Sequence, residues 1–424
     1  MKKNKKLYVF LTTLIRGVGG GHIYTLCKID SLKSEGFDIQ LIHANDPTSK
    51  IYIDGLRVYE KNYDNCFFFP AYFYSPKEQK RVVERVIKRF IPKYGEYEDI
   101  YIESQTTTCS TWGELIAGKI RAKHLVYLLD EHPKISNISI FGFYSFKLDR
   151  GELAGIGRDS IKTMFEGWRD IKVSPFLLAY NKKPLQDVPY DIRKVRKSDY
   201  IIGSIGRTEK GFLLPALTVV KEFALNHANK SFTVLIIGGS VDNGKPEQAI
   251  QQLFRNIKNV YVHITGLIYP IPICLVKMPH IFLSTAGGVT TSTDLGKVTI
   301  SFDINDFKPI GIINYTTQNR LFRSEDEPAP DLYRLLDEVL IEKKYSETNV
   351  IYNKEKQELS YKPHFDFIAA SNQEKKYYHF EDKGLTVGQV IMKIMIRIVG
   401  TKVTKHVVKN YYPLILRIQN NNKK

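Results

Sequence analysis

The stretch from Tyr200 to Gly211 decides the fold, and it reads Tyr-Ile-Ile-Gly-Ser-Ile-Gly-Arg-Thr-Glu-Lys-Gly. It begins as an apolar run of strand length and continues as a glycine-bounded loop ahead of the helical pattern of Phe212–Ala228. Glycine lets a backbone turn tightly and approach a ligand closely. Arg207 offers a planar fork for phosphate oxygens, and Lys210 adds a compact charge. The spacing favours a strand–loop–helix unit that binds a diphosphate, although an ordinary loop with exposed charges would look the same.

Similar strand and helix patterns alternate on both sides of this stretch, and a basic, proline-containing segment at 182–198 separates two series. Such alternation is typical of a mostly parallel sheet covered by helices. The predicted strands are Leu7–Thr13, Phe37–His43, Asp99–Ser104, His124–Leu129, Tyr200–Ile205, Phe232–Gly239, Val260–Thr265, Ile281–Ser284 and Val298–Phe302. The predicted helices are His22–Lys33, 77–90, Thr111–Ile120, Phe212–Ala228, Pro246–Ile257 and Asp331–Glu342.

Two separate series in a chain of 424 residues indicate two domains, because one compact core does not grow to that size. We therefore predict an α/β fold with two Rossmann-like domains that face each other across a cleft. Residues 1–181 form the first predicted domain, 199–345 the second, and 346–424 a polar and then basic tail. Ligands bind beyond the carboxyl ends of the strands in such sheets, so the cleft is the expected site.

Composition narrows the class of protein further. The four cysteines are scattered without paired spacing, which argues against a disulfide framework or a zinc site and fits a reducing, cytoplasmic setting. The net charge of +17 favours polyanionic partners, but no nucleic-acid-binding motif is visible, so we expect none. The basic start followed by Leu7–Ile15 resembles a signal peptide, yet the run is short and enters a glycine loop, so we interpret it as a strand.

A second loop of small residues follows the predicted strand Ile281–Ser284. Its backbone N–H groups and hydroxyls could bind a sugar or its phosphates, or the turn could simply cap a helix. The residues of this loop that we expect to bind a donor are Gly287, Gly288, Val289, Thr290 and Thr291.

Taken in order, these features resemble the nucleotide-binding domain of GT-B glycosyltransferases, especially those of family 4. The resemblance covers about Asp199–Asp303, and the opening strand with Gly17–Gly21 matches more loosely. It implies a nucleotide-diphosphate sugar as donor, with a UDP-sugar favoured, and Arg207 and Lys210 as catalytic residues at the diphosphate. The residues that carry the resemblance or its implied donor contacts include Gly206, Arg207, Lys210, Gly211, Gly238, Gly239, Gly266, Leu267, Gly296, Gly20 and Gly21.

One departure from the family pattern concerns the pair of glutamates that family 4 enzymes carry before the last glycine. Thr291 stands near the position of the second glutamate, and Asp294 is the nearest carboxylate. This leaves open a divergent active site or a non-catalytic subunit that binds a partner transferase or a glycan, and it leaves the stereochemistry of transfer open. A dinucleotide-dependent oxidoreductase is a weaker alternative, because Gly17–Gly21 lacks the last glycine of that fingerprint.

On the acceptor side, His132 follows a predicted strand and resembles the histidine that faces the transferred sugar in this family. A solvated loop histidine would have the same context. Glu131 and Glu103 are candidates for binding the acceptor, whereas His22 is interpreted as structural. No Asp-x-Asp triplet is present, and GT-B enzymes generally need no metal, so we predict neither a metal ion nor another cofactor.

The last forty residues, 385–424, contain eight Lys or Arg and no Asp or Glu. Apolar residues recur there at helical spacing, which is typical of a basic amphipathic helix on an anionic membrane. Packing of this helix on the first domain is an equal alternative, and both can hold. The expected function is transfer of a hexose to a cell-surface glycan (capsule, lipopolysaccharide or glycoprotein type) at the cytoplasmic membrane face.

Overall fold

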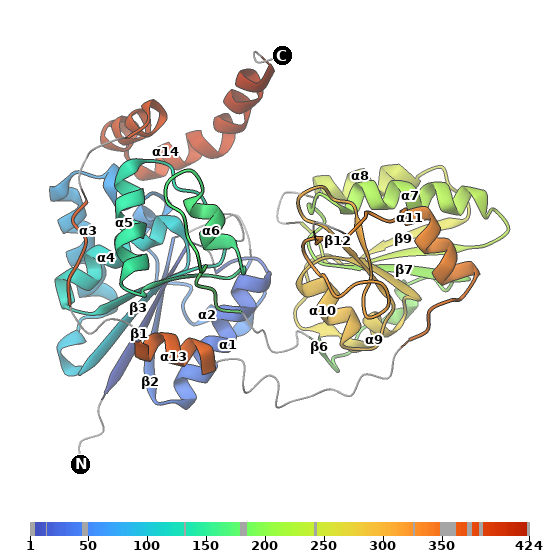
Figure 1. The fold of residues 1–424 in the computed structure, drawn as a ribbon, viewed down its shortest axis with the longest axis horizontal. Helices are drawn as coiled ribbons and strands as arrows, with labels where there is room; N and C mark the ends of the chain where they lie inside the picture. The colour runs from blue at the N-terminus through green and yellow to red at the C-terminus, as the bar shows by residue number, and fades with distance from the viewer. Residues whose placement is uncertain are drawn as a thin grey trace.

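Two parallel sheets, each covered by helices, make up the body of the chain (Figure 1). The computed structural model describes residues 5–13, 15–44, 50–130, 133–178, 185–240, 244–324, 327–347, 362–370, 375–380 and 385–421. The predicted α/β fold with two Rossmann-like domains is confirmed.

The first sheet has the strand order β2-β1-β3-β4-β5, and its pairs are parallel. The order reverses between β1 and β3, so the loops that follow these two strands border a crevice. Its strands are β1 Lys6–Thr12, β2 Phe37–His43, β3 Asp99–Ser104, β4 Lys123–Leu128 and β5 Leu153–Gly155. Its helices are α1 Gly20–Ser34, α2 Asp54–Arg57, α3 Pro76–Phe90, α4 Thr107–Ile120, α5 Ile138–Asp149 and α6 Ser160–Phe165.

The second sheet has the order β13-β12-β11-β7-β8-β9, with β13 antiparallel at the edge. The order reverses between β7 and β11, the two strands that precede the predicted donor loops. Its strands are β7 Tyr200–Ile205, β8 Phe232–Ile237, β9 Val260–Ile264, β11 Ile281–Ser284, β12 Thr299–Phe302 and β13 Pro309–Ile312. Its helices are α7 Leu213–Asn226, α8 Lys245–Phe254, α9 Ile273–Lys277, α10 Gly287–Thr293 and α11 Leu332–Leu336, which continues as a π-helical turn, Asp337–Ile341.

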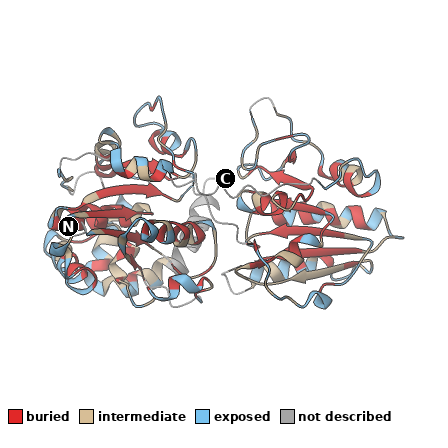
Figure 2. Cartoon of the chain, turned by 90° about the horizontal axis from the view of Figure 1, so that it is seen from below, coloured by how far each residue is buried: buried red, intermediate tan, exposed pale blue. Residues whose placement is uncertain are grey.

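The central strands are buried almost throughout, the edge strands β2 and β9 only in part, and the helices turn one face inward (Figure 2). β8 shows this most clearly, because all of its residues are buried. Such fully covered strands appear in the sequence as continuous apolar runs, which is why the predicted strands match the observed ones closely. By contrast, α5 was not predicted: it is apolar on nearly every side, so no 3.6-residue alternation marks it.

Two local predictions need adjustment. Gly20 and Gly21 do not belong to a loop, because they are the first residues of α1. The segment predicted as a linker contains a short strand, β6 Leu185–Gln186, which pairs in parallel with β10 Ile271–Pro272 beside the second sheet.

The C-terminal part of the chain returns to the first domain. Helix α13 Lys362–Ala370 buries Ile368 in the cluster that contains α1, and α14 Val387–Asn421 buries Ile396 in the cluster on the opposite face of the sheet. Between them, the backbone N–H of Tyr378 donates to Glu114 Oε1 at 2.7 Å. The alternative in which the tail packs on the first domain is therefore the observed arrangement of these described segments.

His364 fastens α13 to that domain. Its Nε2 lies 2.8 Å from the carbonyl oxygen of Leu178, and its Nδ1 lies 3.4 Å from Lys28 Nζ, which is ion-paired with Glu103. Burial, and then the charge of Lys28, lower the pKa of His364 to about 4. The imidazole is therefore neutral in the folded chain near pH 7.

This lowered pKa predicts an acid-sensitive anchor. As the pH falls from 6.5 toward 4, the unfolded chain binds a proton that the folded imidazole does not, so the free energy of unfolding falls. One such group loses about 2 kcal/mol at pH 5. We expect the urea midpoint of His364→Gln to drop less between pH 7 and pH 5 than that of the unsubstituted protein. His379→Gln, at an exposed position, is the control, and an equal drop in all three proteins would contradict the assignment.

Candidate functional site

The loop between β7 and α7 is held by a close backbone contact with the next strand. Gly206 has φ +137°, and a Cβ placed on Gly238, which has φ +148°, would come 1.9 Å from the carbonyl oxygen of Gly206. The N–H of Gly206 also donates to the carbonyl of Ile237 at 3.1 Å. Both positions favour glycine through their positive φ, and at Gly238 the carbonyl of Gly206 also leaves no space for a side chain.

Two cations stand at this loop. A Cβ on Gly206 would lie 3.3 Å from Lys210 Nζ, so the ammonium group lies beside the glycine backbone. The guanidinium of Arg207 is half exposed and forms an ion pair of 3.3 Å with Glu209. The other oxygen of that carboxylate, Oε2, is buried and has no hydrogen-bond partner among the described residues. The pair of cations at the sheet's switch point is a suitable arrangement for a diphosphate.

Glu247, in the first turn of α8, joins this loop to the one after β8. Its carboxylate accepts hydrogen bonds of 2.8 Å from Thr208 Oγ1 and Ser240 Oγ, and another from the backbone N–H of Ser240. Burial alone would raise the pKa of Glu247, but these hydrogen bonds lower it. The sequence analysis missed this residue, although an acid in the first turn of a predicted helix is a readable signal.

The loop after β9 packs against the loop after β8. A Cβ on Gly239 would lie 3.0 Å from both the Cα of Gly266 and the amide nitrogen of Leu267. Gly266 has φ +71°, and Thr265 Oγ1 accepts a hydrogen bond of 3.0 Å from the N–H of Gly238. The structure therefore brings the predicted residues Gly266 and Leu267 next to the β8 loop, at the same sheet edge as Gly206.

Helix α10 begins against the end of β7. A Cβ on Gly288 would lie 2.4 Å from the carbonyl oxygen of Ile205, so the second predicted donor loop meets the first. Gly287 is exposed with open space around it, and Val289 is fully buried. Ala286, the N-cap residue that precedes Gly287, has φ +53°, an unusual conformation for alanine.

The hydroxyls of this helix point to protein partners. Thr291 Oγ1 donates back to the carbonyl of Gly287 at 2.8 Å, which gives this hydroxyl a role within the helix. Thr290 Oγ1 accepts a hydrogen bond of 3.1 Å from Arg320, an exposed cation that the sequence analysis did not single out. Thr290 is thus the more open of the two hydroxyls toward a ligand, and Arg320 adds positive charge near it.

The first domain contributes His22, in the first turn of α1. Its Nε2 is buried and has no hydrogen-bond partner among the described residues. Burial lowers the pKa of His22 to about 4; a hydrogen bond with the Arg16 backbone opposes this shift, and the nearby charge of Arg207 adds to it. The effect of Arg207 places this cation of the second domain close to His22. His22 was interpreted as structural, and its unpartnered Nε2 together with the nearby charge of Arg207 makes it a further candidate for the site.

A second contact between the domains lies beside α1. Tyr269, in the loop that follows β9, packs against the hydrophobic cluster of the first domain and lies near Cys27 and Asp30. This contact joins the loop after β9 to the middle of α1.

Of the predicted acceptor residues, Glu103 lies inside the first domain. Its carboxylate is 1% exposed, forms an ion pair of 2.5 Å with Lys28, and accepts hydrogen bonds from Tyr8 at 2.5 Å and Tyr24 at 3.3 Å. A carboxylate whose oxygens are taken up by core partners is not available to an acceptor, so we correct this assignment to a structural one. Glu131 and His132 lie outside the described residues. The preceding Leu129 is close to α1, because a Cβ on Gly21 would meet its side chain at 3.2 Å.

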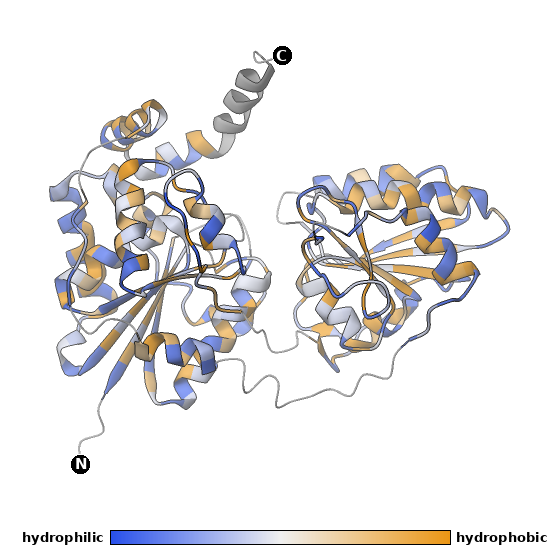
Figure 3. Cartoon of the chain, in the orientation of Figure 1, coloured by the Kyte–Doolittle hydropathy of each residue, from blue (hydrophilic) through white to orange (hydrophobic). Residues whose placement is uncertain are grey.

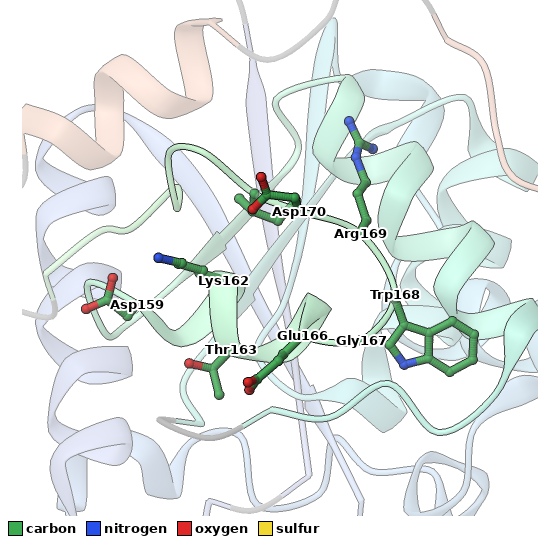
Figure 4. A pocket seen from close by; sticks show the side chains of 9 residues that line it. Asp159, Lys162, Thr163, Glu166, Gly167, Trp168, Arg169 and Asp170 are labelled. Atoms are coloured by element: carbon green, nitrogen blue, oxygen red, sulfur yellow. The ribbon is translucent and has the colours of Figure 1, made fainter.

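A pocket of about 730 Å³ opens beside α6, which starts shortly after β5 ends (Figure 4). Asp159 and Glu166 line it with carboxylates, and Lys162 and Arg169 line it with cations. Trp168 lies at its edge, 40% exposed, and stacks on Phe141 at 5.2 Å between ring centroids. Such a mixture of carboxylates, cations and an aromatic ring can bind a polar organic molecule.

In the described part of the chain, no group of three or more His, Cys, Asp or Glu side chains could hold a metal ion. The cations at the candidate site are Arg207 and Lys210 at the β7 loop and Arg320 beside Thr290.

No protein-family model matches the chain, and no curated protein matches it in sequence. Solved structures do match in fold. A glycosyltransferase from Rickettsia africae is 14% identical, with a TM-score of 0.53, and the match covers 96% of this chain and all of that protein. HepE from Anabaena in complex with UDP and glucose is 12% identical, with a TM-score of 0.51, and the match covers 87% and 97% of the two chains. These similarities establish the GT-B fold.

The contact between Gly238 and Gly206 gives a prediction about stability. Gly238→Ala should lower the free energy of unfolding by at least about 2 kcal/mol, because the new methyl group meets a carbonyl oxygen in a strained conformation. Gly287→Ala is the matched control, since nothing lies within 4 Å of its Cβ position. Thermal unfolding followed by circular dichroism measures both, and equal midpoints would refute the close contact.

Proposed function

We propose that this chain is a glycosyltransferase that moves a hexose from a UDP-sugar to a cell-surface glycan at the cytoplasmic membrane face. The observation that carries the proposal is the position of Arg207 and Lys210 beside Gly206, with the neutral His22 of the other domain close by. The similarity in fold to HepE, whose structure holds UDP and glucose, supports this choice of donor.

In this proposal the diphosphate of the donor lies against Gly206. When the bond between the sugar and the diphosphate breaks, the electron pair goes to the phosphate oxygen. Arg207 and Lys210 stabilise the negative charge that develops there, and such fixed charges contribute a large part of catalysis. Gly266 and Leu267 would border the nucleoside, and Gly287, Gly288 and Thr290 would border the phosphates or the sugar.

His22 would bind the donor sugar from the first domain. Its pKa of about 4 keeps the imidazole neutral at physiological pH, so its Nε2 can form one hydrogen bond with a sugar hydroxyl. Gly20 and Gly21 allow the sugar to approach the start of α1 without side chains in the way. Glu131 and His132 remain our proposed acceptor-side residues, and the glycan would approach along the loops of the first domain. We propose that transfer needs no metal ion.

A non-catalytic GT-B subunit is the second candidate, and a specific observation favours it. No glutamate occurs between Ser284 and Gly296, where family 4 enzymes carry their pair. A subunit of this kind would bind a glycan or a partner transferase. Calorimetric titration with UDP and GDP sugars separates the candidates, since an enzyme binds one of them and hydrolyses it slowly, whereas a glycan-binding subunit without a donor site binds neither.

The proposal predicts that Arg207→Ala combined with Lys210→Ala weakens UDP binding at least tenfold and abolishes hydrolysis of the donor. Two charge-assisted contacts to the diphosphate are lost, while the backbone of the loop is kept. The matched control is Arg255→Ala with Lys258→Ala, two exposed cations at the opposite edge of the second sheet. Calorimetry with UDP gives the affinity, and the idea fails if the double variant and its control bind equally.

A separate prediction concerns the sugar. His22→Ala should lower turnover of the UDP-sugar at least tenfold while changing the affinity for UDP less than threefold, because the imidazole is proposed to contact the sugar. His22→Gln provides a second variant of similar size, and His379→Ala is the exposed control. Parallel losses of UDP affinity and turnover would show that His22 acts on the nucleotide or on folding, and would exclude the proposed contact.

A further inference from the structure

The first part of α14 has two faces, and one of them packs on the first domain. Ile396 is buried in the hydrophobic cluster of that domain, and Met392 packs against the same cluster. Gln389 is hydrogen-bonded to Ser136 and Asn137, at 3.0 and 3.2 Å. These positions lie on one side of a helix, so the helix has a fixed rotation on the domain.

The opposite face carries aliphatic side chains that point to solvent. Val387 and Ile398, at its two ends, are each 77% exposed. The spacing of the set repeats every three or four residues, which places all members on one stripe. The stripe consists of Val387, Val390, Ile391, Ile394 and Ile398, and we call it the α14 stripe.

A contiguous row of exposed β-branched side chains is not the ordinary scatter of apolar residues on a protein surface. The helix ends its first part at Gly400, where φ is +79°, and a second helical part continues from there. Figure 3 shows hydrophobic and hydrophilic residues alternating along the first part of α14, on the outside of the first domain. The stripe therefore has the form of a surface that another apolar body covers.

The charges beside the stripe indicate which partner covers it. Lys393 and Arg397 flank the stripe, and the residues 385–424 contain eight basic and no acidic side chains. The charge of Arg397 helps to lower the pKa of Glu78, a carboxylate that is hydrogen-bonded to Ser75 at 2.6 Å. A second copy of the chain would bring like charges together, whereas an anionic lipid surface brings opposite ones.

A helix that crosses the membrane is a different arrangement, and among the described residues no helix has the length and apolar character for it. A helix that lies in the plane of the interface needs only one apolar face with basic flanks. A helix that binds in this way as part of a folded protein has one face packed on its domain and the other face exposed, and the first part of α14 has this arrangement.

We propose that the α14 stripe docks on an anionic phospholipid bilayer, with the helix parallel to the surface and Lys393 and Arg397 at the headgroups. This surface lies on the first domain and does not involve Arg207 or Lys210, so it can hold or fail independently of the proposed donor site.

The test uses the full chain and sedimentation with vesicles of phosphatidylcholine, with or without phosphatidylglycerol. We expect binding to the mixed vesicles and at least tenfold weaker binding to phosphatidylcholine alone. Ile391→Glu with Ile394→Glu should reduce binding to the mixed vesicles at least tenfold. The control is Val58→Glu with Val173→Glu, two exposed valines elsewhere on the first domain, which should bind as the unsubstituted protein does.

Three results would overturn the proposal. One is undiminished binding of the Ile391 and Ile394 variant to mixed vesicles. Another is equal binding of the unsubstituted chain to neutral and mixed vesicles. The last is a dimer in sedimentation equilibrium without lipid that the same variant dissociates, because the stripe would then be covered by a second copy. Circular dichroism and UDP affinity of the variant serve as checks that its fold is intact.

Discussion

The candidate site depends on one backbone contact, the approach of Gly238 to the carbonyl of Gly206. Because neither residue carries a side chain, the carboxyl ends of β7 and β8 can turn away from the sheet almost touching each other. That turn brings Lys210 back over the glycine and leaves Arg207 half exposed beside it. Glu247 then fixes the two loops together through Thr208 and Ser240. Any anion that binds here meets a preorganised set of charges.

The second domain alone does not complete the site. His22, at the start of α1, feels the charge of Arg207, and Tyr269 in the loop after β9 packs on the first-domain cluster that contains α1. Desolvation lowers the pKa of His22 to about 4, so its imidazole is neutral near pH 7. The two halves therefore supply different chemistry: positive charge from one, and a neutral hydrogen-bonding group from the other. This division is consistent with the donor that we propose, which has a charged diphosphate and an uncharged sugar.

The tail adds a third element to the first domain. His364 and Tyr378 attach it through buried polar contacts, and Ile396 attaches α14 through an apolar one. These contacts lie in three different segments of the tail, so the tail is attached to the first domain at three points. The outward stripe on α14 is thereby given a fixed orientation, which a loosely attached helix would not have.

The sequence by itself determined the longer strands, the glycine-bounded loop after Tyr200–Ile205 and its two cations, because buried strands are continuous apolar runs and glycines mark positive φ. Tyr200–Ile205 and Phe232–Ile237 are examples, since both are near-continuous apolar runs. Only the tertiary structure decided that Glu103 is a core residue, that the charge of Arg207 acts on His22, and that α13 inserts His364 beside Lys28. These contacts join segments that are far apart in the sequence. Burial of a side chain by a distant segment does not change the local periodicity of residues, so no local pattern predicts it.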